Sequence, residues 1–208
     1  ESGGQVGDKG IIFSDNAEFR VTDTRKTPQG IFIHFGNIIS GNFKIGHEVN
    51  LKIDTSLRDF IKKNHSATHL LHAALRNNLG LHVAQRGSLV NENKLRFDFS
   101  HNKQISSKQI DIIQKEVTDI ISNSCETQIE IKSQEEAIKQ GAMALFGEKY
   151  GEEVRVVTLG KHNNKPYSIE LCGGTHVTNV KDIEKFYIIS EESVSSGIRR
   201  IEACTGNK

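Results

Sequence analysis

The chain has 208 residues, of which 36% are hydrophobic and 25% are charged, so it is polar for a globular protein but long enough for one large or two small domains. Its 27 Lys and Arg residues nearly balance 26 Asp and Glu residues, and the net charge of +1 excludes a strongly basic nucleic-acid coat. No stretch approaches the ~20 consecutive apolar residues of a membrane helix, which predicts a cytoplasmic protein with no membrane partner. Because the sequence begins at Glu1 without a methionine, we expect a piece of a longer protein.

Short apolar runs separated by turn residues characterise the first quarter of the sequence. The runs lie at residues 11–13, 17–21, 31–35 and 49–53, and Gly, Asn, Asp and Pro residues separate them. Runs of this length with such boundaries predict short strands. We therefore expect a small β-barrel-like subdomain over residues 1–56.

The pattern changes at Leu57, where apolar and histidine residues begin to recur at helical spacing up to Gly80, a residue typical of a helix C-terminus. A second helix is predicted after Ser106, and the capping-box pair Ser133 and Glu136 predicts the start of a short third helix. Strands are predicted at residues 81–90, 94–99, 127–132, 154–159, 167–171 and 186–189. Because these elements lack a regular βαβ rhythm, we expect an α+β core with a mainly antiparallel sheet over residues 57–208.

Two histidines within the first predicted helix form a possible metal half-site. His65 and His69 are four residues apart, so both imidazoles leave the same face of the helix one turn apart. About 0.4 such pairs are expected by chance in a chain with nine histidines, so this spacing is also compatible with ordinary buried histidines. His72 lies on the same stripe and fits a core position equally well.

The second half-site is the sequence Cys172-Gly173-Gly174-Thr175-His176, in which a flexible Gly-Gly pair lets a thiolate and an imidazole approach one centre. The three cysteines are odd in number and widely spaced, which favours reduced thiols that are free to bind a metal. Three nitrogen ligands and one sulfur ligand suit zinc. The spacing alone leaves both a zinc site and a structural role open.

Several longer motifs resemble the editing region of the alanyl-tRNA synthetase family. They lie at residues 64–71 (NHSATHLL), 85–90 (QRGSLV), 95–100 (LRFDFS), 145–151 (LFGEKYG) and 170–177 (ELCGGTHV), with further matches at residues 1–8 and 197–203. The resemblance spans the chain, and its motifs are specific. It implies a small β-barrel followed by an editing core of the kind shared with free-standing alanyl-tRNA deacylases and with a domain of threonyl-tRNA synthetase.

The resemblance implies an aminoacyl-tRNA deacylase that hydrolyses the ester of seryl- and glycyl-tRNA(Ala), with zinc as cofactor. It assigns the zinc ligands to His65, His69, Cys172 and His176. In the same motifs, Gln85 matches a glutamine associated with editing and Thr68 a threonine beside the amino-acid pocket, so we expect both in catalysis, with Thr68 and Ser88 binding substrate. Arg199 and Arg200 are further substrate-binding candidates that could meet tRNA phosphates, although adjacent arginines on a sheet surface are commonly just solvated. Mischarged tRNA(Ala) and the remainder of the synthetase chain are the implied partners, and the fragment itself is not expected to charge tRNA.

An apolar pocket distinguishes alanine from serine or glycine by a binding free energy of only ~1–3 kcal/mol. A second, hydrolytic site is therefore needed to remove the wrong amino acid. A polar group such as the Thr68 hydroxyl could pair with the serine hydroxyl and be left unpaired by alanine. Four protein ligands would ordinarily make a closed structural zinc site. A non-catalytic tRNA-binding module with structural zinc therefore stays open as an alternative. A second alternative is a free-standing deacylase that edits in trans, which would be similar in both subdomains.

Overall fold

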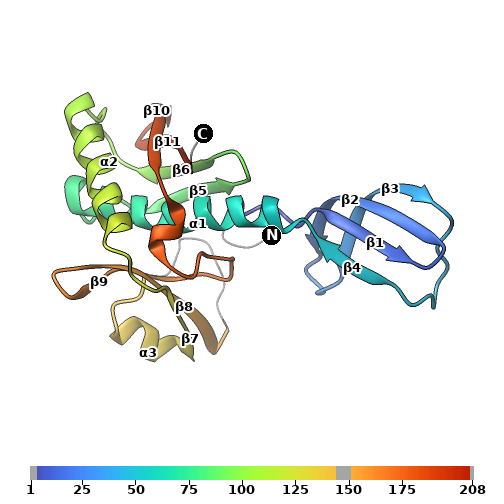
Figure 1. Cartoon of the computed structure of the whole chain (residues 1–208). Helices are drawn as coiled ribbons and strands as arrows, with labels where there is room; N and C mark the ends of the chain where they lie inside the picture. The colour runs from blue at the N-terminus through green and yellow to red at the C-terminus, as the bar shows by residue number, and fades with distance from the viewer. Residues whose placement is uncertain (1–3, 144–150, 207–208) are drawn as a thin grey trace.

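The computed structural model describes residues 4–143 and 151–206, and the fold is α+β with mostly antiparallel sheets. The motif residues 1–3 and 145–150 lie outside this described part. A small sheet lies at one end of the molecule, and the long helix α1 (Thr55–Leu79) leads from it into a larger α+β body (Figure 1). No helix in the described part is long and apolar enough to cross a membrane.

The small sheet contains the four strands predicted for the first quarter of the chain. These are β1 (Gly10–Ser14), β2 (Ala17–Lys26), β3 (Phe32–Ser40) and β4 (Asn50–Ile53). They pair in the order β3-β2-β1-β4, and each pair is antiparallel. Within the described residues no pairing joins β3 to β4, so the sheet is open and not a closed barrel.

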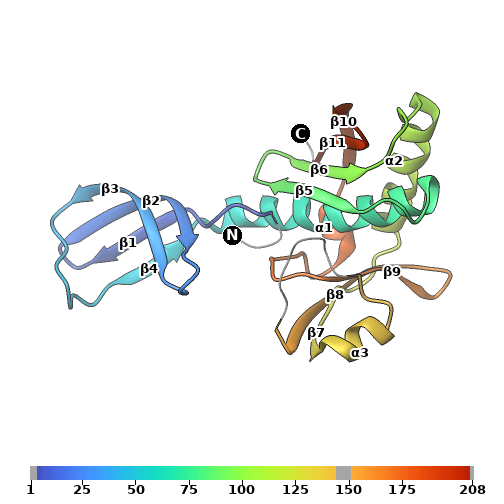
Figure 2. The ribbon, with the colours of Figure 1, turned by 180° about the vertical axis from the view of Figure 1, so that it is seen from behind.

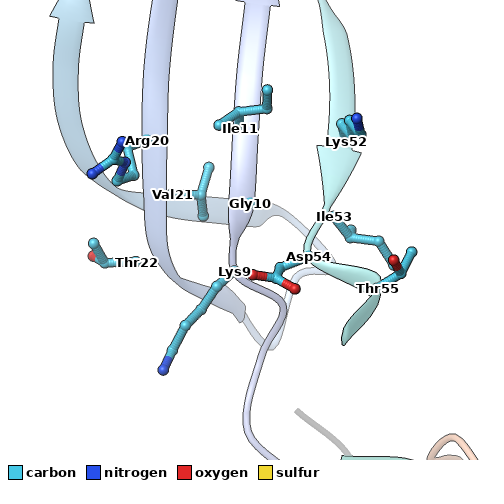
Figure 3. Close-up of a pocket in the computed structure, with 10 residues that line it drawn as sticks. All are labelled: Lys9, Gly10, Ile11, Arg20, Val21, Thr22, Lys52, Ile53, Asp54 and Thr55. Atoms are coloured by element: carbon cyan, nitrogen blue, oxygen red, sulfur yellow. The ribbon is translucent and has the colours of Figure 1, made fainter. Parts of the chain in front are cut away.

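A surface hollow of about 620 Å³ lies on this small sheet (Figure 3). Arg20, Ile11 and Lys52 line it from three adjacent strands, because the register places Ile11 opposite both Arg20 and Lys52. The hollow is separate from the buried histidines of α1 and contains none of the predicted metal ligands.

Helix α1 confirms the helix predicted from Leu57 to Gly80. The Asp54 side chain accepts a hydrogen bond from the Leu57 amide at 3.1 Å, which caps the helix N-terminus. At the other end, Gly80 has a φ of 116° and donates its amide hydrogen to the Arg76 carbonyl. Since β4 ends at Ile53, only Asp54 separates the small sheet from α1. The division of the chain at residue 56 stays a prediction.

The larger body surrounds α1, which is buried almost without interruption from Asn64 to Leu75. Its remaining elements are β5 (Gln85–Val90), β6 (Leu95–Ser100), α2 (Ser107–Ser122), β7 (Gln128–Ser133), α3 (Gln134–Lys139), β8 (Glu153–His162), β9 (Lys165–Leu171), the short 3-10 helix η1 (Val180–Ile183), β10 (Phe186–Ser195) and β11 (Ile198–Thr205). One sheet has the order β10-β11-β6-β5 and the other β7-β8-β9. In both views α1 runs between these two sheets (Figures 1 and 2).

The apolar side of α1 forms the main core with both sheets and α2. Leu70, Leu71 and Leu75 of α1 have no exposed surface and belong to the same buried cluster as Phe97, Phe99 and Ile201. Burying one such side chain stabilises the fold by roughly 1.5–3 kcal/mol, so this cluster fixes α1 firmly. The metal-ligand candidates on α1 are therefore carried by one of the best-packed elements of the protein.

Strand β11 was not predicted, and the strand predicted at 81–90 begins only at Gln85. The sequence Ile198-Arg199-Arg200-Ile201-Glu202 lacks a clean alternation of apolar and polar residues, which is the usual sign of a strand. The structure supplies the reason, because Arg199 and Arg200 both form ion pairs with carboxylates of neighbouring strands. Charged residues in this strand are thus neutralised within the sheet.

Candidate metal centre

Four buried side chains from two distant parts of the chain meet beside α1. His65, His69, Cys172 and His176 each offer one ligand atom, and these atoms all lie within 4.8 Å of one another. The Cys172 sulfur lies 3.4 Å from Nε2 of His65. A metal with bonds of about 2.0–2.3 Å needs its ligand atoms roughly this close together. The geometry shows that the group could hold a metal ion.

The loop after β9 reaches the two α1 histidines because its backbone is fixed and because Gly174 has no side chain. One Nη atom of Arg155 donates to the carbonyl oxygens of Cys172 and Gly174, each at 2.7 Å. A Cβ atom on Gly174 would lie 2.1 Å from Cε1 of His65, a distance that no real contact allows. The close approach of the loop to α1 therefore requires glycine at this position.

Each of the three histidines is held through its Nδ1 atom by a different side chain. The partners are Oε1 of Gln5 for His65 at 3.0 Å, Oε2 of Glu170 for His69 at 2.6 Å, and Oγ of Ser66 for His176 at 3.3 Å. This arrangement leaves the three Nε2 atoms for another ligand. Partners of this kind are typical of metal-ligating histidines, since they fix the orientation of the ring.

Unpartnered nitrogen atoms give an independent sign that the group fits a metal. Nε2 of His69 and Nε2 of His176 are buried and have no hydrogen-bond partner among the described residues. A buried polar atom without a partner costs about 1–3 kcal/mol, so such atoms are uncommon unless something binds them. A metal ion in the group would satisfy both atoms at once.

The charges around the group favour a cation. Burial works against a charge on Cys172, but the charge of His69 and hydrogen bonds from His176, His65 and His69 together outweigh burial and hold the pKa of the thiol well below its usual range. Burial likewise disfavours a charged His69, whereas the Glu170 carboxylate and the Cys172 sulfur raise the pKa of His69 to about 10. His69 therefore holds a proton between two buried anions, the Cys172 thiolate and the Glu170 carboxylate. A metal ion bound to the group could take the place of that proton.

The structure places the predicted pocket residue Thr68 on α1, between the two histidine ligands in sequence. Thr68 is buried, and its hydroxyl donates a hydrogen bond to the Asn64 carbonyl oxygen at 2.8 Å. The hydroxyl proton is therefore engaged within the helix, and only the oxygen lone pairs are available to another group.

Gln85 and Ser88 lie on β5, away from the four ligand residues in sequence. Gln85 is half-buried and pairs in register with Phe99, while the Ser88 hydroxyl is buried without a hydrogen-bond partner in the described structure. Both residues are on the same sheet that packs against α1. Within the described residues no hydrogen bond joins either side chain to the metal-ligand group, so their roles stay predictions.

Arg199 and Arg200 are neutralised by neighbouring strands. Arg199 binds Glu191, with a distance of 2.7 Å between Nη2 and Oε2. Arg200 forms a two-pronged ion pair with Asp98, its partner on the adjacent strand β6, at 2.6 and 2.9 Å. A role for these arginines in tRNA binding stays a prediction, and it would require sharing or exchanging these carboxylate partners.

The turn before β1 contributes to the site. Oε1 of Gln5 accepts hydrogen bonds from His65 and from both the amide and the hydroxyl of Thr175, each at 3.0 Å. Gly4 does adopt a turn conformation with a φ of 78°, and this turn brings Gln5 toward α1. No local signal identifies this contact, because it joins residues 60 and 170 positions apart.

The histidines of the small sheet should not take part in metal binding. The His34 ring contacts the Thr24 hydroxyl on the adjacent strand, and His47 follows β3 in a connecting segment, outside the ligand group. We expect His34→Ala and His47→Ala to leave the metal content per chain unchanged in elemental analysis. A loss of metal in either variant would show that the small sheet supplies a ligand.

Comparisons with known proteins find two family models and several relatives that match this chain. Residues 154–202 match the family model described as the threonyl and alanyl tRNA synthetase second additional domain, and residues 1–57 match the model for class II (A) tRNA synthetases. The chain is 53% identical over 210 residues to the alanine-tRNA ligase of Parvibaculum lavamentivorans, covering 99% of this chain and 24% of that protein. Its identity to the ligases of Mesorhizobium japonicum and Rhizobium johnstonii is 49% and 48%, with the same coverage.

The match covers nearly the whole of this chain but only part of the relatives. The chain spans only about a quarter of the length of these relatives, so the similarity concerns one region of a much larger enzyme. Over that region the similarity is nearly continuous, and it includes both half-sites of the metal-ligand group. The chain is therefore a homologue of one region of the alanine-tRNA ligases, and its residues 154–202 match the second additional domain.

Proposed function

We propose that this region hydrolyses the aminoacyl ester of tRNA(Ala) mischarged with serine or glycine, at a zinc ion held by His65, His69, Cys172 and His176. The observation that carries the proposal is the convergence of four buried ligand atoms within 4.8 Å in a chain that matches the second additional domain. The donor set of three imidazoles and one thiolate suits zinc better than a hard cation such as magnesium. The reaction would take place in the cytoplasm, with the rest of the ligase chain as a covalent partner.

The residues of the chain would divide the work of binding and positioning. When bound, zinc would supply Lewis-acid chemistry at the ester or lower the pKa of a water molecule. Thr68 would face the amino acid next to the ligand His69, and its hydroxyl oxygen could accept a hydrogen bond from the serine hydroxyl. Gln85 and Ser88, from β5, would contribute polar groups at the adjacent sheet. Thr68 would thus select serine over alanine. Selection of glycine over alanine would need a different contact.

The direct test is the release of labelled serine from seryl-tRNA(Ala) by the 208-residue chain. We expect release that exceeds the spontaneous rate, is removed by a zinc chelator and returns when zinc is added. A chain that binds zinc and tRNA yet releases no serine would contradict the proposed catalysis.

One observation favours a second function, that of a tRNA-binding module with structural zinc. All four ligand atoms come from buried side chains, and a site with four protein ligands is typically closed. Under this reading a chelator would weaken folding and tRNA binding, and the intact chain would release no serine. The same release assay, combined with a tRNA-binding measurement, therefore distinguishes the two functions.

A substitution at Thr68 tests how serine is recognised. Thr68→Val keeps the shape of the side chain but removes the hydroxyl oxygen, so the serine hydroxyl loses its partner in a buried pocket. We expect hydrolysis of seryl-tRNA(Ala) to fall by roughly 5- to 150-fold, which corresponds to about 1–3 kcal/mol. Hydrolysis of glycyl-tRNA(Ala) should change less, and the zinc content should stay the same. Equal losses with both substrates would assign Thr68 to a structural role.

A further inference from the structure

One carboxylate in the core is bound by two histidines, of which only one belongs to the metal-ligand group. Glu170 lies on β9 and is 2% exposed. Its Oε2 atom accepts from Nδ1 of His69 at 2.6 Å, and its Oε1 atom accepts from Nδ1 of His72 at 2.9 Å. The Ser168 hydroxyl donates to the same Oε1 atom at 3.4 Å. Each oxygen of the carboxylate therefore has a fixed partner.

The two histidines stand three positions apart on α1, so their rings leave the same side of the helix and one carboxylate can reach both. His72 is 1% exposed and packs against the Phe97 ring, with the ring centroids 5.0 Å apart. Its Nε2 atom is buried and has no hydrogen-bond partner among the described residues. His72 is not a member of the metal-ligand group, so its placement in the core needs another explanation.

We propose that His72 and Glu170 form a positioning pair, in which His72 holds the carboxylate in place and the carboxylate fixes the His69 ring with Nε2 directed at the metal. The inference rests on the proposed zinc site and adds two residues that bind no metal themselves. A carboxylate between a ligand histidine and the core typically orients the ring and strengthens it as a ligand. Here the carboxylate is itself anchored on the far side by a second imidazole.

His72 and Glu170 differ from an ordinary buried ion pair because Glu170 also contacts a metal-ligand candidate, His69. Without His72, the long contact from Ser168 would be the only side-chain hydrogen bond left to Oε1 among the described residues, and the carboxylate could rotate away from His69. Rotation would allow the His69 ring to turn, so that Nδ1 and Nε2 would no longer have fixed roles. The pair therefore makes zinc affinity depend on a residue outside the ligand group.

Zinc affinity of the 208-residue chain, measured by competition with a chelating dye, tests the pair. We expect Glu170→Gln to bind zinc about 10- to 100-fold more weakly than the unmodified chain. Glu116→Gln is the matched control, because Glu116 accepts hydrogen bonds from Asn77, Asn78 and Tyr167 away from the metal-ligand group. The control should keep its zinc affinity even if it loses stability.

Two variants at His72 keep the test decisive if Glu170→Gln fails to fold. His72→Gln retains an N–H donor toward Glu170 and should stay close to the unmodified affinity, whereas His72→Leu should lose about 10-fold. In zinc-loaded protein, NMR should show slowly exchanging Nδ1–H signals from both His69 and His72. Both signals should disappear in Glu170→Gln and persist in Glu116→Gln.

The possible failures are distinguishable. If the unmodified chain binds no zinc, the proposed metal centre itself is wrong. If the unmodified chain binds zinc and Glu170→Gln and His72→Leu bind it equally well, the centre stands and the positioning pair is overturned. Equal losses in His72→Leu and His72→Gln would likewise overturn it, because a hydrogen-bonding role predicts rescue by the glutamine.

Discussion

Replacing Cys172 with alanine should remove zinc binding and hydrolysis of both mischarged substrates together. The change removes the one sulfur ligand of the group, so three imidazoles remain and one coordination position of the metal has no protein ligand. We expect zinc affinity to fall by more than ~100-fold, since even a change in the partner of a ligand costs about 10–100-fold. Chelator competition measures the affinity, and release of labelled serine and glycine measures the activity.

The other cysteines provide a matched control for this variant. Cys125 and Cys204 are free and half-buried, and neither belongs to the metal-ligand group. Cys125→Ala and Cys204→Ala should therefore retain both zinc and activity. If the Cys172→Ala protein kept full activity without zinc, the metal would have no part in the reaction.

The substitution Gly174→Ala should disrupt the site without touching a ligand. Its new methyl group would lie 2.1 Å from Cε1 of His65 and 2.5 Å from Nδ1, so the loop or the His65 ring must move. A displacement of about 1 Å at a reacting centre can cost about 100-fold in rate. We expect a loss of this size in hydrolysis of seryl-tRNA(Ala), with a parallel decrease in zinc affinity.

Gly151→Ala controls for the general effect of replacing a glycine. Among the described residues, the nearest neighbour of a Cβ atom at Gly151 would be the Glu153 carbonyl oxygen at 3.9 Å, which is an ordinary contact. That variant should behave like the unmodified chain in both assays. A Gly174→Ala protein with unchanged zinc affinity would mean that the loop can move away from α1 at little cost.

Local patterns were sufficient to predict the helices, because their signals lie within a few residues. The capping boxes at Ser106 with Gln109 and at Ser133 with Glu136 are both formed, and α1 ends at Gly80. The α+β class also follows from such local patterns. Strand β11 was not predicted because its arginines pair with residues of other strands. Such pairing does not produce an alternation of apolar and polar residues within the strand itself.

The candidate site was predictable as two halves but not as a whole. The pair of histidines on α1 and the pair after β9 each have a spacing that indicates a metal ligand set. The side chains that hold those ligands have no such spacing, because Gln5 and Glu170 reach α1 from distant parts of the chain. Even His72, which shares the helix face, gave no sign of its contact with Glu170, since helical spacing fits an ordinary core histidine equally well.

The distance along the chain between the two half-sites has a consequence for the order of folding. Cys172 and His65 are separated by 107 positions, whereas the two histidines of α1 stand one helical turn apart. The helical pair can capture a metal ion early, but the complete centre forms only after both sheets have assembled around α1. In the unfolded chain, bringing together the ends of a loop of about 100 residues costs entropy worth about 4–5 kcal/mol, so the complete centre does not persist there. Bound metal should therefore form its last bonds late in folding and slow global unfolding. Metal-free protein should open first at the loop after β9.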